Sequence, residues 1–180
     1  LAQGEAFRQA KQLESATVLL EEARLHYPEH EDLALLTARV YLDAEQPLAA
    51  GTILQQAASR NSDLYFETAE CFRMAKQQQR ALYFNSLVTD LEAKARQRLG
   101  MFIDEEEWTR ALALGPRLAR LSLDEEDKIA YALAYAGFQV RDFERAEAYL
   151  KTISEPSLFR DATALRQQMM ECQQSGWRCR

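Results

Sequence analysis

The chain has 180 residues, with 28 acidic residues, 22 lysines and arginines and a formal net charge of −6. Both signs are interspersed, which excludes the electrostatic footprint of a nucleic-acid-binding protein, and no apolar run approaches the roughly 18 residues of a membrane span. Glycines (six) and prolines (four) are scarce, while the strong helix formers Ala, Leu, Glu, Gln and Arg dominate. The composition therefore predicts an all-α chain without strands.

A small residue recurs in the second helix of each of five expected helix pairs. These residues are Ala16, Ala50, Ala81, Ala111 and Ala146, separated by 34, 31, 30 and 35 residues. Such a period in a helical chain is typical of a solenoid. It predicts helical repeats over 1–155 (about 1–30, 31–61, 62–91, 92–123 and 124–155), a capping helix over 156–174 and a tail at 175–180.

The first unit shows the pattern most fully. Gly4 and Phe7 fall in its first helix, and Leu13 and Ala16 in its second. The last unit repeats the order with Ala134, Gly137, Phe143 and Ala146. This order of small and aromatic residues resembles the tetratricopeptide repeat (TPR) family. The resemblance implies a right-handed α-α superhelix of about five helix pairs plus a C-terminal capping helix.

The chain departs from the TPR pattern mainly in its middle. Pro47 and Gln78 stand where an aromatic residue is usual, and Asn85 and Gly115 stand where a large apolar residue is usual. The third and fourth units are also short. We therefore expect the superhelix to be most distorted there.

In the geometry of the resembled family, the first helix of each pair faces a concave groove that holds the partner. The corresponding residues are Leu35, Arg39, Phe66, Glu70, Arg73, Arg96, Ile103, Tyr131, Tyr135 and Phe138. One interpretation is that the aromatic members pack between repeats. The other is that the aromatics at 131–138 form an apolar anchor, while Arg73 and Arg96 contact a carboxylate-bearing ligand. Aromatic and arginine side chains are the types enriched in binding hot spots.

Family members that clamp acidic C-terminal tails of cytosolic chaperones carry Lys, Asn and Arg at fixed places in the groove. At those places this chain has Leu35, Leu36, Asp63 and Glu67. We therefore do not expect a chaperone-tail adaptor.

Two cysteines near the C-terminus, Cys172 and Cys179, are separated by six residues that include Gly176. A disulfide between them would stabilise the tail by about 2.5 kcal/mol in the loop-entropy model. It would also indicate an oxidising compartment such as a bacterial periplasm. The alternative is a pair of free thiols, which would favour the cytoplasm. Cys71, beside Phe72, is expected to be a buried packing thiol.

Several polar clusters have structural interpretations. Pro28 lies between His26 and His30, so the two histidines are expected in a turn rather than in a metal site. The acidic runs at 104–107 and 124–127 fall at expected helix starts, where carboxylates favour the helix dipole. No converging set of catalytic or metal-ligating residues is found, so neither an enzyme nor a cofactor is expected.

Three helix starts carry capping signals. Asp104 with Glu107, and Ser122 with Glu125, predict capping boxes. Asp142 is predicted to cap the last helix of the fifth unit.

The sequence favours a non-catalytic scaffold that presents a concave groove to a peptide or protein, as part of a Gram-negative bacterial envelope assembly. One alternative is a carbohydrate-guiding module of an exopolysaccharide export system, with Tyr131 and Tyr135 stacking on sugars. Another is self-assembly into a homo-oligomer through the N-terminal repeat. Because the chain lacks an initiator Met and the first helix, 1–10, lacks its opening turn, we expect a fragment or a processed product, with further repeats upstream.

Overall fold

The computed structural model describes residues 1–174, and every regular element among them is a helix. The first elements are α1 (Ala2–Gln9), α2 (Leu13–His26), α3 (Glu31–Asp43), α4 (Pro47–Ala58), the 3-10 turn η1 (Ser62–Leu64), α5 (Tyr65–Met74) and α6 (Gln78–Leu87). They are followed by α7 (Leu91–Asp104), α8 (Trp108–Ala113), α9 (Gly115–Arg120), α10 (Asp127–Gln139), α11 (Phe143–Leu150) and α12 (Pro156–Gln174). The predicted all-α class is confirmed for this part of the chain. None of these helices is both long and apolar enough to cross a membrane.

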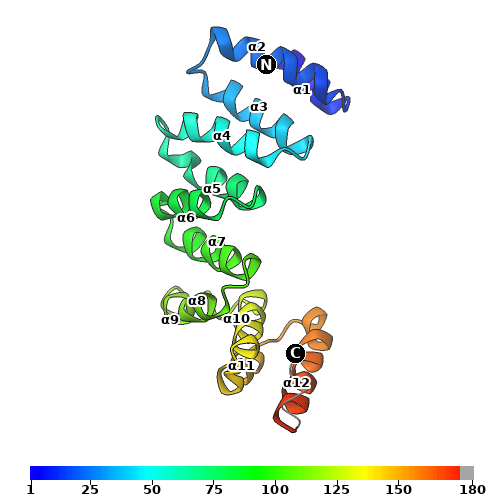
Figure 1. The fold of residues 1–180 in the computed structure, drawn as a ribbon, viewed down its shortest axis with the longest axis vertical. Helices are drawn as coiled ribbons and strands as arrows, with labels where there is room; N and C mark the ends of the chain where they lie inside the picture. The colour runs from blue at the N-terminus through cyan, green and yellow to red at the C-terminus, as the bar shows by residue number, and fades with distance from the viewer. Residues whose placement is uncertain (175–180) are drawn as a thin grey trace. The chain divides into compact units, whose positions relative to one another are not determined.

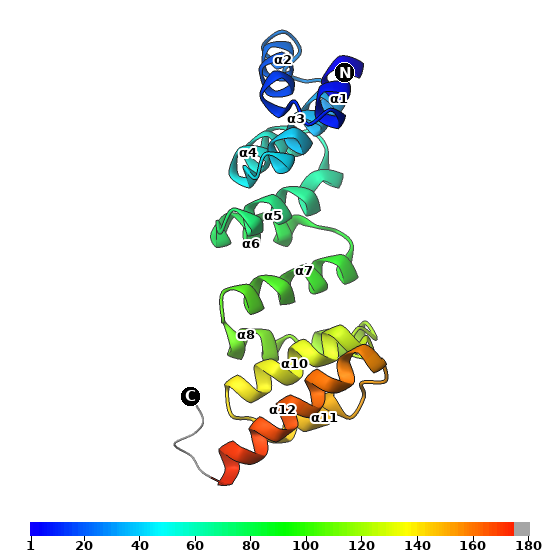
Figure 2. The same cartoon turned by 90° about the vertical axis from the view of Figure 1, so that its right-hand side faces the viewer.

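The chain divides into two compact units, Leu1–Lys94 and Ala95–Arg180. The boundary between them falls inside α7. In the first unit each helix packs on the next: α1 with α2, α3 with α4 and α5 with α6 form pairs, while α2–α3 and α4–α5 contacts join them (Figure 1). In the second unit, α10 packs against α8, α11 and α12 (Figure 2). From α1 to α6, helices that are neighbours in sequence are therefore neighbours in space.

The five recurrent alanines are all completely buried. Ala16, Ala50, Ala81, Ala111 and Ala146 each have a relative exposure of 0%. The helix backbones come close together around them, as at Gly137, where an added Cβ would lie 3.2 Å from the Cβ of Ala146. A larger side chain at such a site would force the paired helices apart. Packing therefore requires a small residue at Ala146, and the complete burial of the other four alanines agrees with the same role.

A left-handed turn residue lies five positions before each of these alanines. The turn residues are Lys11, Glu45, Lys76, Glu106 and Arg141, with φ values of 60, 58, 56, 56 and 62°. In each turn the next N–H donates to the carbonyl oxygen five residues back, as from Gln12 to Phe7 at 2.9 Å and from Asp142 to Gly137 at 2.8 Å. This is the Schellman arrangement that ends a helix. The same turn thus joins the helices of every pair.

The two predicted capping boxes are wrong, whereas the predicted cap at Asp142 is confirmed. Asp104 is the last residue of α7, and Glu107 precedes α8 without a side-chain capping bond. Ser122 lies in a left-handed turn (φ 54°), and α10 begins only at Asp127. The backbone bonds of the Schellman turns occupy these places instead. Asp142 accepts a hydrogen bond from the Arg145 N–H at 3.2 Å.

The unusual residues of the middle units have structural explanations. Asn85 is fully buried, and its Nδ2 donates to the carbonyl oxygen of Lys94 at 3.0 Å. Gly115 is buried where an added Cβ would collide with the hydroxyl of Tyr149. The second helix of the fourth unit breaks at Leu114 into α8 and α9. The helix is therefore divided in this region, whereas the distortion of a superhelix stays a prediction.

Candidate functional site

An open groove of about 550 Å³ lies between α3 and α5 in the first unit. Its apolar lining includes Leu35, Ala38 and Leu42 on α3, Leu54 on α4, and Leu64, Phe66, Cys71 and Met74 on or beside α5. Four of the predicted groove residues, Leu35, Arg39, Phe66 and Glu70, line this one groove. The first helices of two adjacent pairs therefore form a shared surface.

Helical spacing explains why α3 has an apolar face on the groove as well as one in the core. Leu35 and Leu42 are seven residues apart, so they lie on the same side of the helix. Leu33, Leu36 and Val40 lie on a different side and are buried in a cluster with Leu20 of α2. Leu35 and Leu42 remain only half-buried. Apolar area therefore remains accessible on this side of α3.

The charged residues that line the groove are mostly acidic. Glu31, Asp63, Glu67 and Glu70 contribute carboxylates, and Arg39 contributes the cation of this lining set. Glu70 is paired internally, because the Nε of Arg73 lies 3.0 Å from both of its carboxylate oxygens. An Asn61 Nδ2–H donates to Glu31 at 2.6 Å. Among residues 1–174, the side chains of Asp63 and Glu67 form neither a hydrogen bond nor an ion pair.

The apolar lining residues form the groove floor, and the thiol of Cys71 among them indicates its polarity and electrostatic potential. The side chain is free and 3% exposed, which confirms the predicted packing thiol. Burial raises its pKa to about 11, and the negative charges of Glu70 and Glu67 add to the effect. The floor is thus both apolar and negative in potential.

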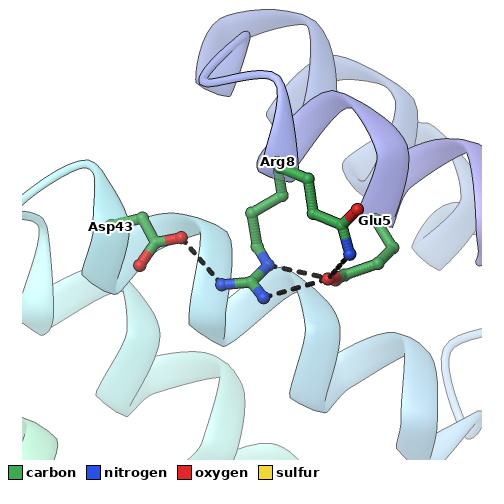
Figure 3. Close-up of polar contacts among 4 residues, drawn as sticks. Glu5, Arg8 and Asp43 are labelled. Carbon is green, nitrogen blue, oxygen red and sulfur yellow. Dashed lines mark hydrogen bonds and ion pairs between the residues drawn. The ribbon is translucent and has the colours of Figure 1, made fainter.

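A polar network that sequence reasoning missed joins α1 to α3 (Figure 3). Arg8 donates from Nε to Glu5 at 3.0 Å and from Nη1 to Asp43 at 2.9 Å. The pKa of Glu5 is lowered, chiefly by hydrogen bonds from Arg8 and Gln9, and the charge of Arg39 contributes. The three-residue spacing of Glu5 and Arg8 could have predicted their pair. The contact with Asp43 needs the tertiary fold.

The two arginines predicted to bind a ligand carboxylate already contact carboxylates of this chain. Arg73 is paired with Glu70 on α5, and Arg96 of α7 is paired with Glu126 at the start of α10. Arg96 and the half-buried Ile103 both belong to the second unit. Neither therefore lines the groove between α3 and α5.

The predicted aromatic anchor also belongs to the second unit, where its rings pack on neighbours. Tyr135 meets Trp108 edge-on at a centroid distance of 5.4 Å and Phe138 at 6.3 Å. Phe138 lies 6.2 Å from Phe143. Tyr131 packs against the cluster of α10, α11 and α12, and its pKa is raised first by burial and then by Asp161. This packing favours the interpretation that the aromatics fill space between helices.

The two histidines lie at helix ends, and Cys172 lies on the last helix. His30 is the N-cap of α3, with its Nδ1 accepting from the Leu33 N–H at 3.4 Å, and His26 ends α2. Cys172 is buried on α12. Its predicted partner Cys179 lies outside the described residues, so the disulfide stays a prediction.

Comparison with known proteins finds no matching family model, no matching curated protein and no matching solved structure.

Proposed function

We propose that this chain is a non-catalytic interaction scaffold of the TPR type, a right-handed superhelix of helix pairs, and that a peptide or protein segment docks between α3 and α5. The observation that carries the proposal is the open apolar groove itself. Leu35, Leu42 and Phe66 are half-buried, and Met74 is 51% exposed. Concave apolar surfaces with a few placed polar groups are typical of binding sites.

The repeated turns support a recognition role over a catalytic one. Schellman turns of the same kind hold α1 to α2, α3 to α4 and α5 to α6. The groove is therefore built on helices whose positions are set by buried alanines, and little ordering is needed on binding. Stacked helix pairs present extended concave surfaces of this kind to partners.

Placement in a bacterial envelope assembly is a second part of the proposal. It rests on the predicted bond between Cys172 and Cys179, which would need an oxidising compartment. A non-reducing mass measurement on protein purified from its native compartment tests it. Two alkylated cysteines before reduction would contradict the envelope location.

A display library of random short peptides, panned against the folded protein, tests the groove. The groove variant combines Leu35→Gln and Met74→Gln, and the control combines Val18→Gln and Leu25→Gln. The control residues are 69% and 83% exposed on α2, and neither lines the groove. Enriched peptides are expected to lose roughly tenfold in affinity on the groove variant, because two apolar contacts are removed, and nothing on the control.

Circular dichroism melting of both variants checks that the helices remain folded. Equal affinity of the enriched peptides for the groove variant and the wild type would contradict the proposed site. A library from which no peptide is enriched would contradict the binding function.

A further inference from the structure

Resting on the proposed function, we infer that the segment bound between α3 and α5 is amphipathic and positively charged. Its apolar side chains would cover the groove floor. Lysine or arginine side chains beside them would face the acidic rim, which consists of the lining residues Glu31, Asp63, Glu67 and Glu70.

The floor requires an apolar face on the partner. Leu35 and Leu42 on α3 lie opposite Phe66 and Met74 on α5, and all four line the groove. A segment carrying two apolar residues one helical turn apart matches such a floor, because helical residues three or four apart share a face. A purely polar segment would leave this area uncovered.

The rim requires positive charge. The lining residues carry four carboxylates, Glu31, Asp63, Glu67 and Glu70, against the single guanidinium of Arg39. Arg73 neutralises Glu70. The carboxylates of Asp63 and Glu67 are exposed and, within residues 1–174, accept no hydrogen bond from a side chain or backbone. Two acidic groups are therefore available to a cationic partner.

Arg39 does not reverse this balance. Its charge acts on Glu5 of α1, whose pKa it helps to lower. In the groove lining it is one cation beside the two carboxylates of Asp63 and Glu67. An acidic segment would be attracted by Arg39 alone and repelled by the carboxylates of Asp63 and Glu67. Like charges across an interface oppose association.

Neither Arg73 nor Arg96, the two arginines expected to attract a carboxylate, is among the residues that line this groove. Both guanidinium groups are held by internal carboxylates, those of Glu70 and Glu126. The raised pKa of the Cys71 thiol, to which Glu67 and Glu70 contribute, agrees with a negative potential at the groove floor.

Three synthetic peptides test the inference by fluorescence anisotropy. They share a helical frame with two leucines one turn apart, and their flanking residues are lysine, glutamine or glutamate. The lysine peptide is expected to bind about tenfold more tightly than the glutamate peptide. This difference should shrink as the salt concentration rises.

Two variants separate the charge preference from the groove itself. Asp63→Asn with Glu67→Gln should abolish most of the difference between the peptides. The control combines Glu14→Gln and Glu22→Gln, which remove the same charge from exposed positions of α2. This control should keep the affinity difference between the peptides. Leu35→Gln with Met74→Gln should weaken every peptide.

The outcomes distinguish the two proposals. Tighter binding of the glutamate peptide, still weakened by the groove variant, would overturn the charge inference and leave the scaffold function intact. If no peptide binds, or if the groove variant binds the peptides as tightly as the wild type does, both the charge inference and the scaffold function are overturned.

Discussion

Gly137 of α10 and Ala146 of α11 meet so closely that a Cβ added to the glycine would lie 3.2 Å from the Cβ and 3.3 Å from the Cα of the alanine. The contact is between backbones rather than between flexible side chains. Ala146 is completely buried, as are its four counterparts in the other helix pairs. The approach of paired helices is therefore limited by the size of one side chain.

Replacing Ala146 by leucine is expected to lower the free energy of unfolding by about 1–3 kcal/mol, because the larger side chain has no space beside Gly137. Ala148→Leu on the same helix is the control. Ala148 is exposed, so its replacement should change stability by less than about 0.5 kcal/mol. Urea denaturation measures both, and equal midpoints would contradict the packing role of the alanine.

The turn residues offer a stabilising substitution. Lys76 has φ 56°, a conformation that costs an L-residue roughly 1–2 kcal/mol and glycine almost nothing. Lys76→Gly should raise the free energy of unfolding by about 0.5–1 kcal/mol after the extra freedom of glycine in the unfolded chain is subtracted. The neighbouring Gln77 has φ −96°, and Gln77→Gly should not stabilise. A destabilised Lys76→Gly variant would argue against the left-handed turn.

The pair formed by Glu5 and Arg8 predicts a pH effect. Hydrogen bonds from Arg8 hold the pKa of Glu5 below its ordinary 4.5. A lowered folded-state pKa stabilises the protein above the unfolded value, and this contribution is lost as pH falls through the folded value. Glu5→Gln should thus be less stable than wild type near pH 7, with the gap closing below about pH 4.5. Thermal melts across pH 2–8 test this, and a pH-independent gap would contradict it.

Cysteine alkylation tests the burial of one thiol and the predicted bond between two others. The pKa of Cys71 is about 11 instead of 9.0, so its thiolate population at pH 8 is roughly a hundredfold lower. The native protein should alkylate slowly at Cys71, and the unfolded protein quickly. Peptide mass spectrometry also follows Cys172 and Cys179, which are expected to react only after reduction. Rapid native labelling of Cys71 would place it outside the core.

Sequence reasoning succeeded where a local pattern determines packing. The spacing of Ala16 and its counterparts predicted residues that are buried in every pair. The geometry of the resembled repeat family predicted that Leu35 and Phe66 line one groove, and both do. The left-handed turns were not predicted, because Lys, Glu and Arg occupy positions where glycine is the usual signal.

Long-range contacts could not be read from the sequence either. Arg96 pairs with Glu126, thirty residues away, and α12 packs on α10 beside Tyr131. Both contacts depend on the angles between helices. The sequence pattern could therefore not predict that Arg96 is already paired with Glu126 or that Tyr131 packs against the cluster of α10, α11 and α12.

A methyl NMR titration with the lysine peptide shows whether a cationic, amphipathic segment binds between α3 and α5. The predicted result is that the methyl signals of Leu35, Leu42 and Met74 shift together with saturation, while those of Val18 and Leu25 on α2 remain in place. Shifts confined to α2, or spread evenly over the apolar residues of the first unit, would contradict a binding groove between α3 and α5.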